Sequence, residues 1–522
     1  MIDTKALRQK ILDLAIRGKL VPQDPDDEPA SVLLERIRQQ KQQMVKEGKL
    51  KPKDIKNDSD IFVGEDNLHY EKFADGSVKC IEDEIPFDLP EGWAWVRLGN
   101  LSAAIQYGLS NSAEPQGTHR LLRITDIQDG EVDWNAVPFT TVNDPEAYLL
   151  KTGDIVFART GATVGKSFLI TETPYPSVYA SYLIRIRLLG SLSPEYIYQF
   201  FDSACYWSQI TDKSVGVGQP NCNGTSLKKL FIPLPPISEQ LRIVPTAQAL
   251  LAYVAKIDAE KKSLLSIIMA TKSKILDLAI RGQLIPQDPN DEPASVLLER
   301  IRAEKEELIK QGKIKRDKKE SVIFRGEDNS YYEKIGTEVR CINSEIPFDL
   351  PETWCWCRLG TLFAHNTGKA LNSADSAGIP MTYITTSNLY WDRFELDSLK
   401  EMLFADSEID KCTVKKGDLL VCEGGDIGRS AIWMFEENIR IQNHIHRLRP
   451  YISLSGRFYY YVMYMWKQLG LIGGQGIGLQ GFSSKMLHNL IVPLPSIDEQ
   501  ERIVAFIDKL FEPIESIEKS LS

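Results

Sequence analysis

The sequence lacks several signals that would place it in a special class of protein. No apolar run approaches the ~20 residues that a membrane-spanning helix needs, and the first residues are not those of a signal peptide. The eight cysteines include no CxxC pair, and the thiols of Cys355 and Cys357 would lie on one face of a strand, a poor arrangement for zinc. We therefore expect a cytoplasmic protein with reduced thiols, no metal site and no membrane association.

Signatures of catalysis are also scarce. No Gly-x-Gly-x-x-Gly follows a strand-like run, and there is no Asn/Asp-Pro-Pro-Tyr/Phe, the signature of adenine or cytosine amino-methylation. Six histidines leave few candidates for a general base. His444 and His446 lie on a predicted strand over residues 439–447, where both imidazoles would share a face, which favours solvated or hydrogen-bonded histidines over metal ligands. The sequence predicts a non-catalytic protein.

One stretch, GDIVFARTGATVGKS at residues 153–167, resembles the phosphate loop of an ATPase. That loop needs four residues between its first glycine and Gly-Lys, whereas only three separate Gly161 from Gly165. A related stretch at residues 417–430 carries acidic Glu423, which would repel a phosphate. An ATPase that uses residues 161–167 is therefore the weaker alternative, and a strand followed by a tight glycine turn is the favoured interpretation.

Composition indicates an ordinary globular protein with more than one domain. Hydrophobic residues make up 43% and charged residues 26% of the 522 residues, which is typical of globular chains. A chain of this length predicts roughly two to four domains. The net charge of −10 argues against a protein covered in basic patches, but nucleic-acid binding depends on the local field rather than on the sum.

The chain contains the same domain twice. KILDLAIRG at residues 10–18 recurs letter for letter at 274–282, and DEPASVLLERIR at 27–38 recurs at 291–302. Further repeated landmarks are EIPFDLPE (84–91 and 345–352), Trp-x-Trp-x-Arg-Leu-Gly (93–99 and 354–360) and Pro-Leu-Pro-x-Ile-x-Glu-Gln (233–240 and 493–500). Residues 100–230 and 361–490, by contrast, share only sparse matches such as Gly-Asp at 153–154 and 417–418. Similar flanks around dissimilar interiors favour one scaffold that presents two different reading surfaces; a recent duplication whose interiors drifted is the alternative.

A long central helix is predicted over roughly residues 238–282. Apolar residues recur there at heptad spacing, and a helix of about 45 residues would be about 67 Å long. Ser238 and Asp498 are the expected N-caps of this helix and of its C-terminal counterpart, and Pro245 is expected to kink the central helix. The first half of the central helix matches the C-terminal segment and its second half matches the N-terminal segment, so antiparallel packing of both chain ends against it would give an approximate two-fold axis. The residues expected to pack in this helical scaffold are Leu12, Ile16, Leu251, Val254, Leu265, Ile268, Ile275, Val504 and Ile507.

The interiors read mostly as short strands bounded by Gly, Pro and Asn. The predicted fold class is therefore α+β: two similar globular domains separated by long antiparallel coiled-coil helices, with a circular, pseudo-two-fold internal repeat. The predicted segments are an N-terminal helix (1–18), a connecting helix and segment (19–88), a first domain (89–236), the central helix (237–282), a second connecting segment (283–349), a second domain (350–495) and a C-terminal helix (496–522).

These signposts resemble a known family. Leu-Pro-x-x-Trp-x-Trp-x-x-Leu-Gly at the start of each domain, the Gly-Asp run that ends in Gly-Lys/Arg-Ser, and the closing Pro-Leu-Pro-x-Ile-x-Glu-Gln-x-x-Ile-Val are similar to those of the specificity subunit of type I restriction–modification enzymes. The resemblance covers essentially the whole chain, twice over. It implies two target-recognition domains, each of which reads one half of a split, asymmetric double-stranded DNA site.

The same resemblance implies partners and cofactors. The helices would fix the gap between the half-sites and dock two methyltransferase subunits, and a translocating restriction subunit would join the assembly. Adenine methylation and restriction, with their S-adenosylmethionine, ATP and Mg, would belong to those partners, so that no cofactor is expected in this chain.

Direct reading of bases requires Arg, Lys, Asn and Gln, together with cations and hydroxyls for phosphates. The first domain offers Gln106, Tyr107, Ser110, Asn111, Arg123, Arg159, Thr160 and Lys166. The second domain offers Asn366, Thr367, Lys369, Asn372, Thr385, Asn388, Arg429 and Gln480. Residues 91–236 hold eleven Lys/Arg against thirteen Asp/Glu, so we expect the isolated chain to bind DNA weakly until its partners complete the clamp.

Overall fold

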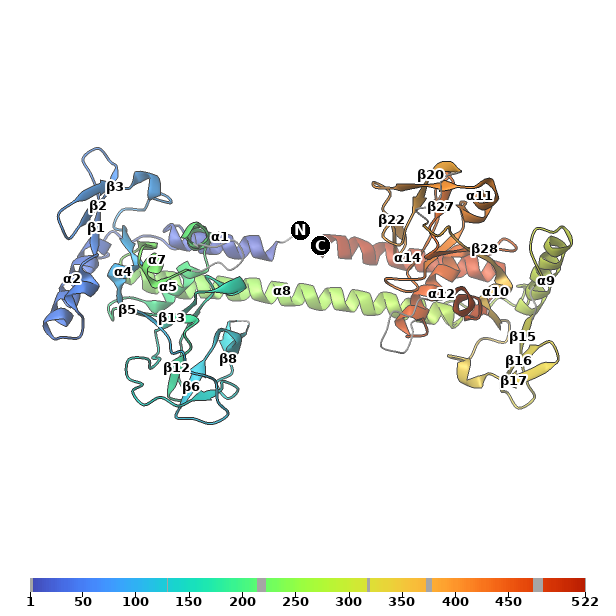
Figure 1. The fold of residues 1–522 in the computed structure, drawn as a ribbon, viewed down its shortest axis with the longest axis horizontal. Helices are drawn as coiled ribbons and strands as arrows, with labels where there is room; N and C mark the ends of the chain where they lie inside the picture. The colour runs from blue at the N-terminus through green and yellow to red at the C-terminus, as the bar shows by residue number, and fades with distance from the viewer. Residues whose placement is uncertain are drawn as a thin grey trace. The chain divides into compact units, whose positions relative to one another are not determined.

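The computed structural model describes residues 3–128, 130–213, 222–316, 320–371, 378–472 and 482–521. The chain divides into two compact units, Met1–Lys261 and Lys262–Ser522, called unit 1 and unit 2 below. Within each unit, the same kinds of helix and strand follow one another along the chain (Figure 1). None of the helices in the described ranges has the length and apolar character that crossing a membrane requires.

Unit 1 carries a helical N-terminal region, a small hairpin sheet and an α+β domain. Its helices are α1 (Thr4–Ile16), α2 (Ala30–Lys46), α3 (Pro52–Ile55), α4 (Leu98–Leu101), α5 (Pro194–Phe201), α6 (Ala204–Lys213), α7 (Gly224–Lys228) and the first part of α8 (Ile237–Ile280). Its strands are β1 (Ser59–Val63), β2 (His69–Phe73), β3 (Val78–Cys80), β4 (Ala94–Arg97), β5 (Ser102–Tyr107), β6 (His119–Leu122), β7 (Ile127–Gln128), β8 (Glu131–Val132), β9 (Phe139–Thr140), β10 (Ile155–Ala158), β11 (Ser167–Leu169), β12 (Ser177–Tyr179), β13 (Leu183–Leu188) and β14 (Phe231–Leu234).

Unit 2 repeats this plan. Its helices are the second part of α8, α9 (Ala294–Lys310), α10 (Leu359–Leu362), α11 (Asp406–Cys412), α12 (Gly456–Gln468), α13 (Ser484–His488) and α14 (Ile497–Leu521). Its strands are β15 (Ser321–Arg325), β16 (Tyr331–Ile335), β17 (Glu338–Cys341), β18 (Cys355–Arg358), β19 (Phe363–Thr367), β20 (Ile379–Ile384), β21 (Leu389–Tyr390), β22 (Arg393–Phe394), β23 (Lys400–Phe404), β24 (Thr413–Val414), β25 (Leu419–Cys422), β26 (Ser430–Ile432), β27 (Ile439–Ile441), β28 (Ile445–Pro450) and β29 (Ile491–Leu494).

The two domain interiors share a strand topology although their sequences differ. In unit 1 a four-stranded antiparallel sheet has the order β11-β10-β13-β5, and in unit 2 the corresponding order is β26-β25-β28-β19. A second sheet in each unit contains one parallel pair, β6 with β12 and β20 with β27. The first and last strands of each domain pair with one another, β4 with β14 and β18 with β29. Each domain interior is therefore closed at its base by the near-identical flanking sequences.

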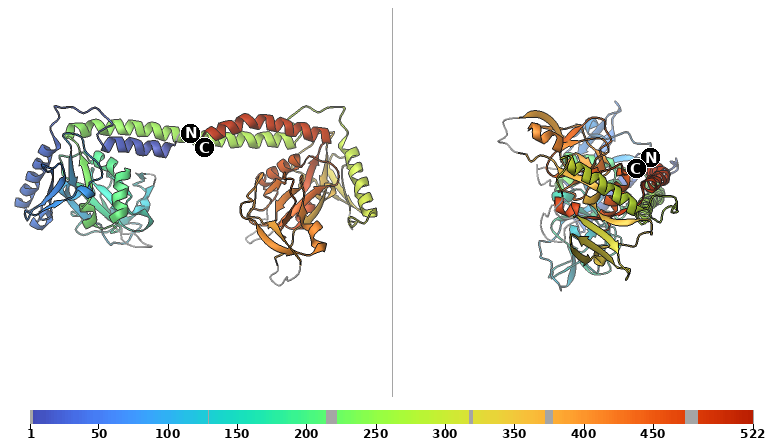
Figure 2. Two further views of the ribbon diagram at one scale, coloured as in Figure 1. Left: turned by 90° about the horizontal axis from the view of Figure 1, so that it is seen from above. Right: turned by 90° about the vertical axis from the view of Figure 1, so that its right-hand side faces the viewer.

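Each unit contains an antiparallel helix pair (Figures 1 and 2). In unit 1 the Thr4 hydroxyl of α1 donates to Asp258 of α8 at 3.0 Å, and further along α1 Ile11 packs with Ala247 and Val254. In unit 2 α14 lies along the second part of α8, where Lys272 forms an ion pair with Glu518 at 2.6 Å. Both chain ends thus pack against the central helix in antiparallel fashion, as the repeat predicts.

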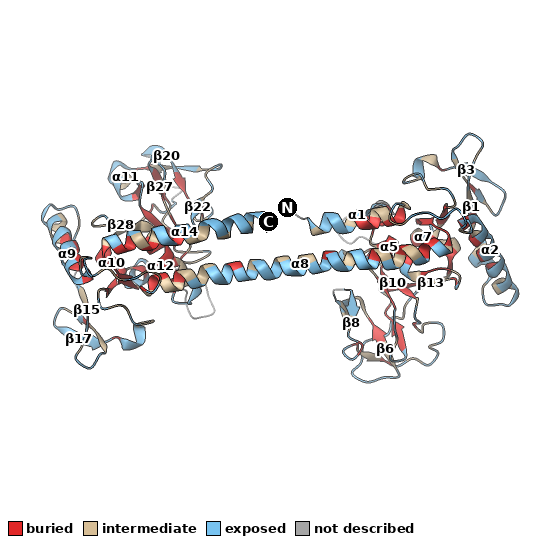
Figure 3. Cartoon of the chain, turned by 180° about the vertical axis from the view of Figure 1, so that it is seen from behind, coloured by how far each residue is buried: buried red, intermediate tan, exposed pale blue. Residues whose placement is uncertain are grey.

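The residues predicted to pack in the helical scaffold are buried or half-buried where the helices contact one another. Leu12, Ile16, Val254, Ile268 and Ile507 are buried, whereas Leu251, Leu265, Ile275 and Val504 are half-buried. Strict heptad spacing does not identify Ile243, Ile280 and Ile503, which are fully buried, because these residues pack on the domains as well as on the neighbouring helix. Other apolar residues of α8 stay exposed, among them Leu241 and Tyr253 in unit 1 and Ile267 and Met269 in unit 2 (Figure 3).

The first residues of the long helices correct the predicted N-caps. Helices α8 and α14 begin at Ile237 and Ile497, so Ser238 and Asp498 lie inside the first turn instead of capping it. The N-cap function before α14 belongs to Ser496, whose hydroxyl accepts from the Glu499 amide at 3.0 Å. Pro245 lies inside helix α8, and the kink expected there stays a prediction.

Candidate nucleic-acid interface

The repeated sequence motifs form a structural framework under each domain. Trp93 Nε1 donates to the buried carboxylate of Glu239 at 2.8 Å, and Trp354 makes the same bond to Glu499 at 2.8 Å. These pairs join the Trp-x-Trp strand to the Glu-Gln turn of the long helix. Packing between each domain and its long helix therefore explains why the Trp-x-Trp and Glu-Gln motifs are nearly identical in the two units.

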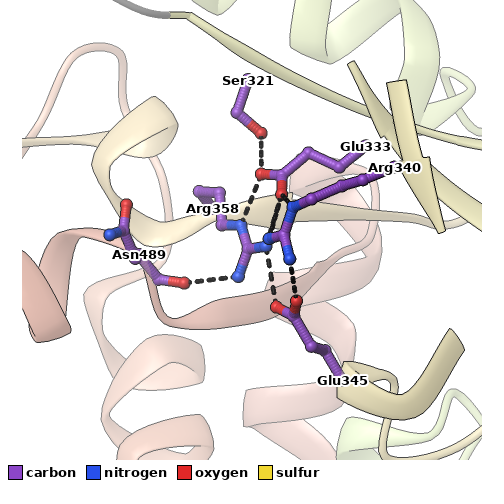
Figure 4. A network of polar contacts seen from close by, with 6 residues as sticks. All are labelled: Ser321, Glu333, Arg340, Glu345, Arg358 and Asn489. Atoms are coloured by element: carbon purple, nitrogen blue, oxygen red, sulfur yellow. Dashed lines mark hydrogen bonds and ion pairs between the residues drawn. The ribbon is translucent and has the colours of Figure 1, made fainter. Parts of the chain in front are cut away.

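A second repeated contact is a buried ion pair. Arg97 bonds to Glu71 in unit 1 at 2.7 Å, and Arg358 bonds to Glu333 in unit 2 at 2.8 Å. In unit 2, Ser321 and Arg340 also bond to Glu333 (Figure 4). Burial raises the pKa of Glu333, but the hydrogen bonds from Arg358, Ser321 and Arg340 together lower it more, to about 2. This carboxylate is therefore charged at neutral pH and ties the hairpin sheet β15-β16-β17 to the domain.

The Gly-Asp motif also has a structural function. Arg187 of β13 forms an ion pair with Asp154 at 2.6 Å, and Arg449 of β28 pairs with Asp418 at 2.6 Å. Both aspartates are buried, so each pair fixes the start of the central strand of the four-stranded sheet. The side chains at the far end of that strand are free to differ between the units.

The glycine turn of residues 161–167 connects two antiparallel strands. Strand β10 leads through a single turn of 3-10 helix (Gly161–Thr163) into β11, and the two strands pair directly. The amide of Gly165 donates to the Ala158 carbonyl at 3.1 Å, and the amide of Ala158 donates to the Lys166 carbonyl at 2.8 Å. A phosphate cradle requires free amides before a helix. The prediction of a strand and turn is confirmed, and nothing in this geometry supports the ATPase alternative.

The structure brings only part of the first domain's candidate readers together. Tyr107 is the last residue of β5, and the guanidinium carbon of Arg159 lies over its ring, 4.8 Å from the centroid of the Tyr107 ring. Thr160 follows Arg159 directly in the sequence. Lys166 is exposed at the start of β11, across the hairpin from Ala158. Gln106 is instead held by Arg185 at 2.8 Å. The remaining candidates lie on loops next to the second sheet: Ser110 is exposed, Asn111 donates to the Thr141 carbonyl, and Arg123 pairs with Asp126.

In the second domain several candidates are committed to internal contacts. Thr385 and Asn388 are buried and form hydrogen bonds with one another. They therefore stabilise the turn after β20, and their side chains are not accessible to a ligand. Lys369 pairs with Glu408 at 2.7 Å, and Arg429 donates to the Thr386 carbonyl at 2.6 Å. Asn366 and Thr367 are half-buried at the end of β19. Asn372 and Gln480 lie outside the described residues.

The histidine-containing segment is not the single strand predicted over residues 439–447. It forms β27 in one sheet and β28 in another, separated by a turn in which the Ile445 amide donates to the Gln442 carbonyl at 3.0 Å. His444 is consequently exposed in the turn whereas His446 is buried in β28. The two imidazoles do not share a face.

Sequence reasoning missed a hydrogen-bonded histidine pair, of which His446 is buried and His365 half-buried. His446 Nε2 donates to the Phe482 carbonyl at 2.7 Å, which leaves its Nδ1 to accept from His365 Nε2 at 2.9 Å. Burial lowers the pKa of both imidazoles, that of His365 to about 4. Unit 1 has Ile105 and Ile184 at the same sheet positions, as the strand registers show. Both histidines are therefore neutral at pH 7 and fill a position that is apolar in unit 1.

Acidification is expected to destabilise unit 2 through this pair. The folded-state pKa of His365 is about 4 against an ordinary 6.5, so between those pH values the unfolded chain binds protons that the folded chain does not. The stability contribution is complete above about pH 6.5 and is lost as the pH falls toward 4. Denaturant unfolding at pH 7 and pH 5 measures it. The double variant His365→Ile/His446→Ile is expected to lose less stability between the two pH values; an equal loss would contradict the assignment.

Comparison with known proteins agrees with this framework. A family model of the type I restriction modification DNA specificity domain matches the chain twice, over residues 90–267 and 351–522. The chain belongs to this family. Each of the two matches to the family model begins near the Trp-x-Trp strand and runs through the domain into the long helix that follows.

Individual relatives of the type I specificity family cover most of the chain. The specificity subunit of the type I restriction enzyme EcoAI from Escherichia coli is 25% identical, over 97% of this chain and 89% of its own length. The EcoEI specificity subunit from Escherichia coli is 30% identical, over 69% of this chain and 62% of its own length. A chain in a solved structure of a type I restriction–modification system, determined to study complex assembly and conformational transition, has the same fold, with a TM-score of 0.55 and 18% identity over 84% of this chain and 94% of that one.

Proposed function

We propose that this chain is the non-catalytic DNA-recognition subunit of a type I restriction–modification complex in the cytoplasm. Each unit reads one half of a bipartite, asymmetric site in double-stranded DNA. The observation that carries the proposal is the repetition of one framework with different side chains at its strand ends. Dissimilar readers require dissimilar half-sites, so the target is not palindromic.

The helices supply the second part of the function. Two readers meet the same face of a duplex only if their spacing follows the helical repeat of about 34 Å. Because α8 continues from unit 1 into unit 2, we assign the spacing of the half-sites to it and to its antiparallel partners α1 and α14.

The proposed partners are two methyltransferase subunits and a restriction subunit. The exposed apolar residues of α8 support docking in each unit, namely Leu241 and Tyr253 in unit 1 and Ile267 and Met269 in unit 2. S-adenosylmethionine, ATP and Mg are proposed to bind those partners, which carry out adenine methylation and cleavage.

Exchange of one domain interior tests the proposal. Residues 100–230 are replaced by the corresponding residues of a relative with a known target. The exchange leaves the β4–β14 pair and the long helix intact, so the hybrid should fold and dock. We expect a new base sequence in one half-site and no change in the other half or in the gap, measured by sequencing methylated DNA from cells that also express the methyltransferase.

The reciprocal exchange of residues 361–490 is the control and should alter only the other half-site. If both halves changed after one exchange, or neither did, the division of reading between the units would be wrong.

A further inference from the structure

The same backbone position carries opposite charge in the two units. Arg159 follows β10 and Glu423 follows β25. The Arg159 amide donates to the Tyr182 carbonyl at 3.1 Å, and the Glu423 amide donates to the His444 carbonyl at 2.9 Å. Their carbonyls accept from the amides of Cys222 and Phe482 at 3.0 and 2.8 Å. Two matching backbone hydrogen bonds therefore place a guanidinium and a carboxylate at one site of the shared fold.

In unit 1 the surroundings leave the cation available. The half-buried Arg159 guanidinium stacks on Tyr107, and its buried Nε has no hydrogen-bond partner among the described residues. No acidic side chain of those residues forms an ion pair with it. Tyr182, which is 64% exposed, lies in the turn just before β13 and accepts from the Arg159 amide, and Lys166 is exposed across the hairpin. A ligand that approaches this guanidinium would therefore not have to break an internal ion pair of the described residues.

In unit 2 the corresponding position presents a carboxylate, which accepts hydrogen bonds. The Glu423 carboxylate is partly exposed, and its ion pair is a long one of 3.8 Å to exposed His444. The nearby charges are engaged elsewhere, since Asp426 pairs with Lys467 at 3.1 Å and Arg429 donates to the Thr386 carbonyl. Arg429 occupies the position of Lys166, as the strand registers show. Its guanidinium donates to the Thr386 carbonyl and stacks on Tyr390, and the ion pairs of the described residues include none between Arg429 and Glu423.

We propose that Arg159 and Glu423 are specificity-determining residues that read bases of opposite hydrogen-bonding character in the two half-sites. This inference rests on the proposed function and deepens it. In the major groove, guanine presents two acceptors that suit arginine, whereas cytosine presents an amino donor that suits a carboxylate. Unit 1 therefore reads a guanine through Arg159, and unit 2 reads a cytosine through Glu423.

Single substitutions in the assembled complex test this assignment. Arg159→Gln keeps a side chain that can stack on Tyr107 but presents the amide that pairs with adenine. We expect discrimination at one base of one half-site to fall roughly tenfold to a hundredfold and to shift from guanine toward adenine. Glu423→Gln should relax one cytosine in the other half-site. Methylated-motif sequencing in cells and competition binding by the purified complex, with each base substituted in turn, measure both effects.

Matched controls change charge elsewhere in the same domains. Lys151→Gln and Glu401→Gln alter exposed residues, one before the start of β10 (the end opposite Arg159) and one within β23, and they should leave the motif unchanged. A uniform weakening across all bases for Arg159→Gln or Glu423→Gln would indicate a phosphate contact and overturn the assignment, as would an unchanged motif. A wild-type complex without any bipartite motif would instead overturn the proposed function itself.

Discussion

Replacing Glu333 by alanine is expected to destabilise unit 2 by about 3–5 kcal/mol, because it leaves Arg358 buried without its carboxylate. The Glu333 side chain is 2% exposed and that of Arg358 is 9% exposed. The guanidinium retains Glu345 and the Asn489 carbonyl, but these partners do not replace the two oxygens that Glu333 supplies. The free energy of unfolding of the full chain in denaturant measures the loss, and hydrogen exchange localises it to unit 2.

Arg340→Gln is the matched control for this network. Arg340 bonds to the same carboxylate, but its side chain is 51% exposed, so the expected loss is below about 1 kcal/mol. Comparable losses for the two variants would mean that burial of the Arg358–Glu333 pair does not determine its contribution.

Replacing Ile507 by aspartate is expected to separate α14 from α8 in unit 2. Ile507 is fully buried in the core that also contains Leu276, Ala279, Ile280 and Ile503. Loss of the apolar side chain alone costs about 2–5 kcal/mol, and the buried carboxylate adds a desolvation penalty of several kcal/mol more. We expect increased hydrogen exchange along α14 and the second part of α8, and loss of methyltransferase binding in a pull-down assay.

Ala505→Asp provides the comparison within the same turn of helix. Ala505 is exposed, so the same charge there should change the free energy of unfolding by less than about 1 kcal/mol. An Ile507→Asp variant with wild-type exchange would show that the helix pair contributes little to the stability of unit 2.

The internal repeat made the pairing of the helices predictable, whereas the pairing of strands in the sheets could not be predicted. Residues 10–18 and 274–282 are identical, so they require the same partner, and the only matching partners are the segments that begin at residues 237 and 497. The parallel pair β6–β12, by contrast, joins Leu121 to Val178, and no local pattern predicts so distant a pairing. The N-cap of α14 is Ser496, two residues before the predicted Asp498, and only two residues separate β29 from this helix.

Among the candidate readers, residue type predicted chemistry but not orientation. Thr385 and Asn388 have the right groups for DNA and are buried in a turn, since their neighbours in space come from distant segments. Glu423 was visible only as an acid that argues against a phosphate. Its equivalence to Arg159 follows from the repeated Gly-Asp, since each residue lies six positions after that glycine, and the matching backbone hydrogen bonds confirm it.

The ion pairs Arg187–Asp154 and Arg449–Asp418 anchor the opposite end of the strand from Arg159 and Glu423. If Arg159 and Glu423 read bases as proposed, folding energy and target choice reside in residues at opposite ends of one strand. A lineage can therefore acquire a new DNA target by point mutation at the strand ends without first passing through an unfolded intermediate sequence, and it can do so in one half of the site while the other half is kept.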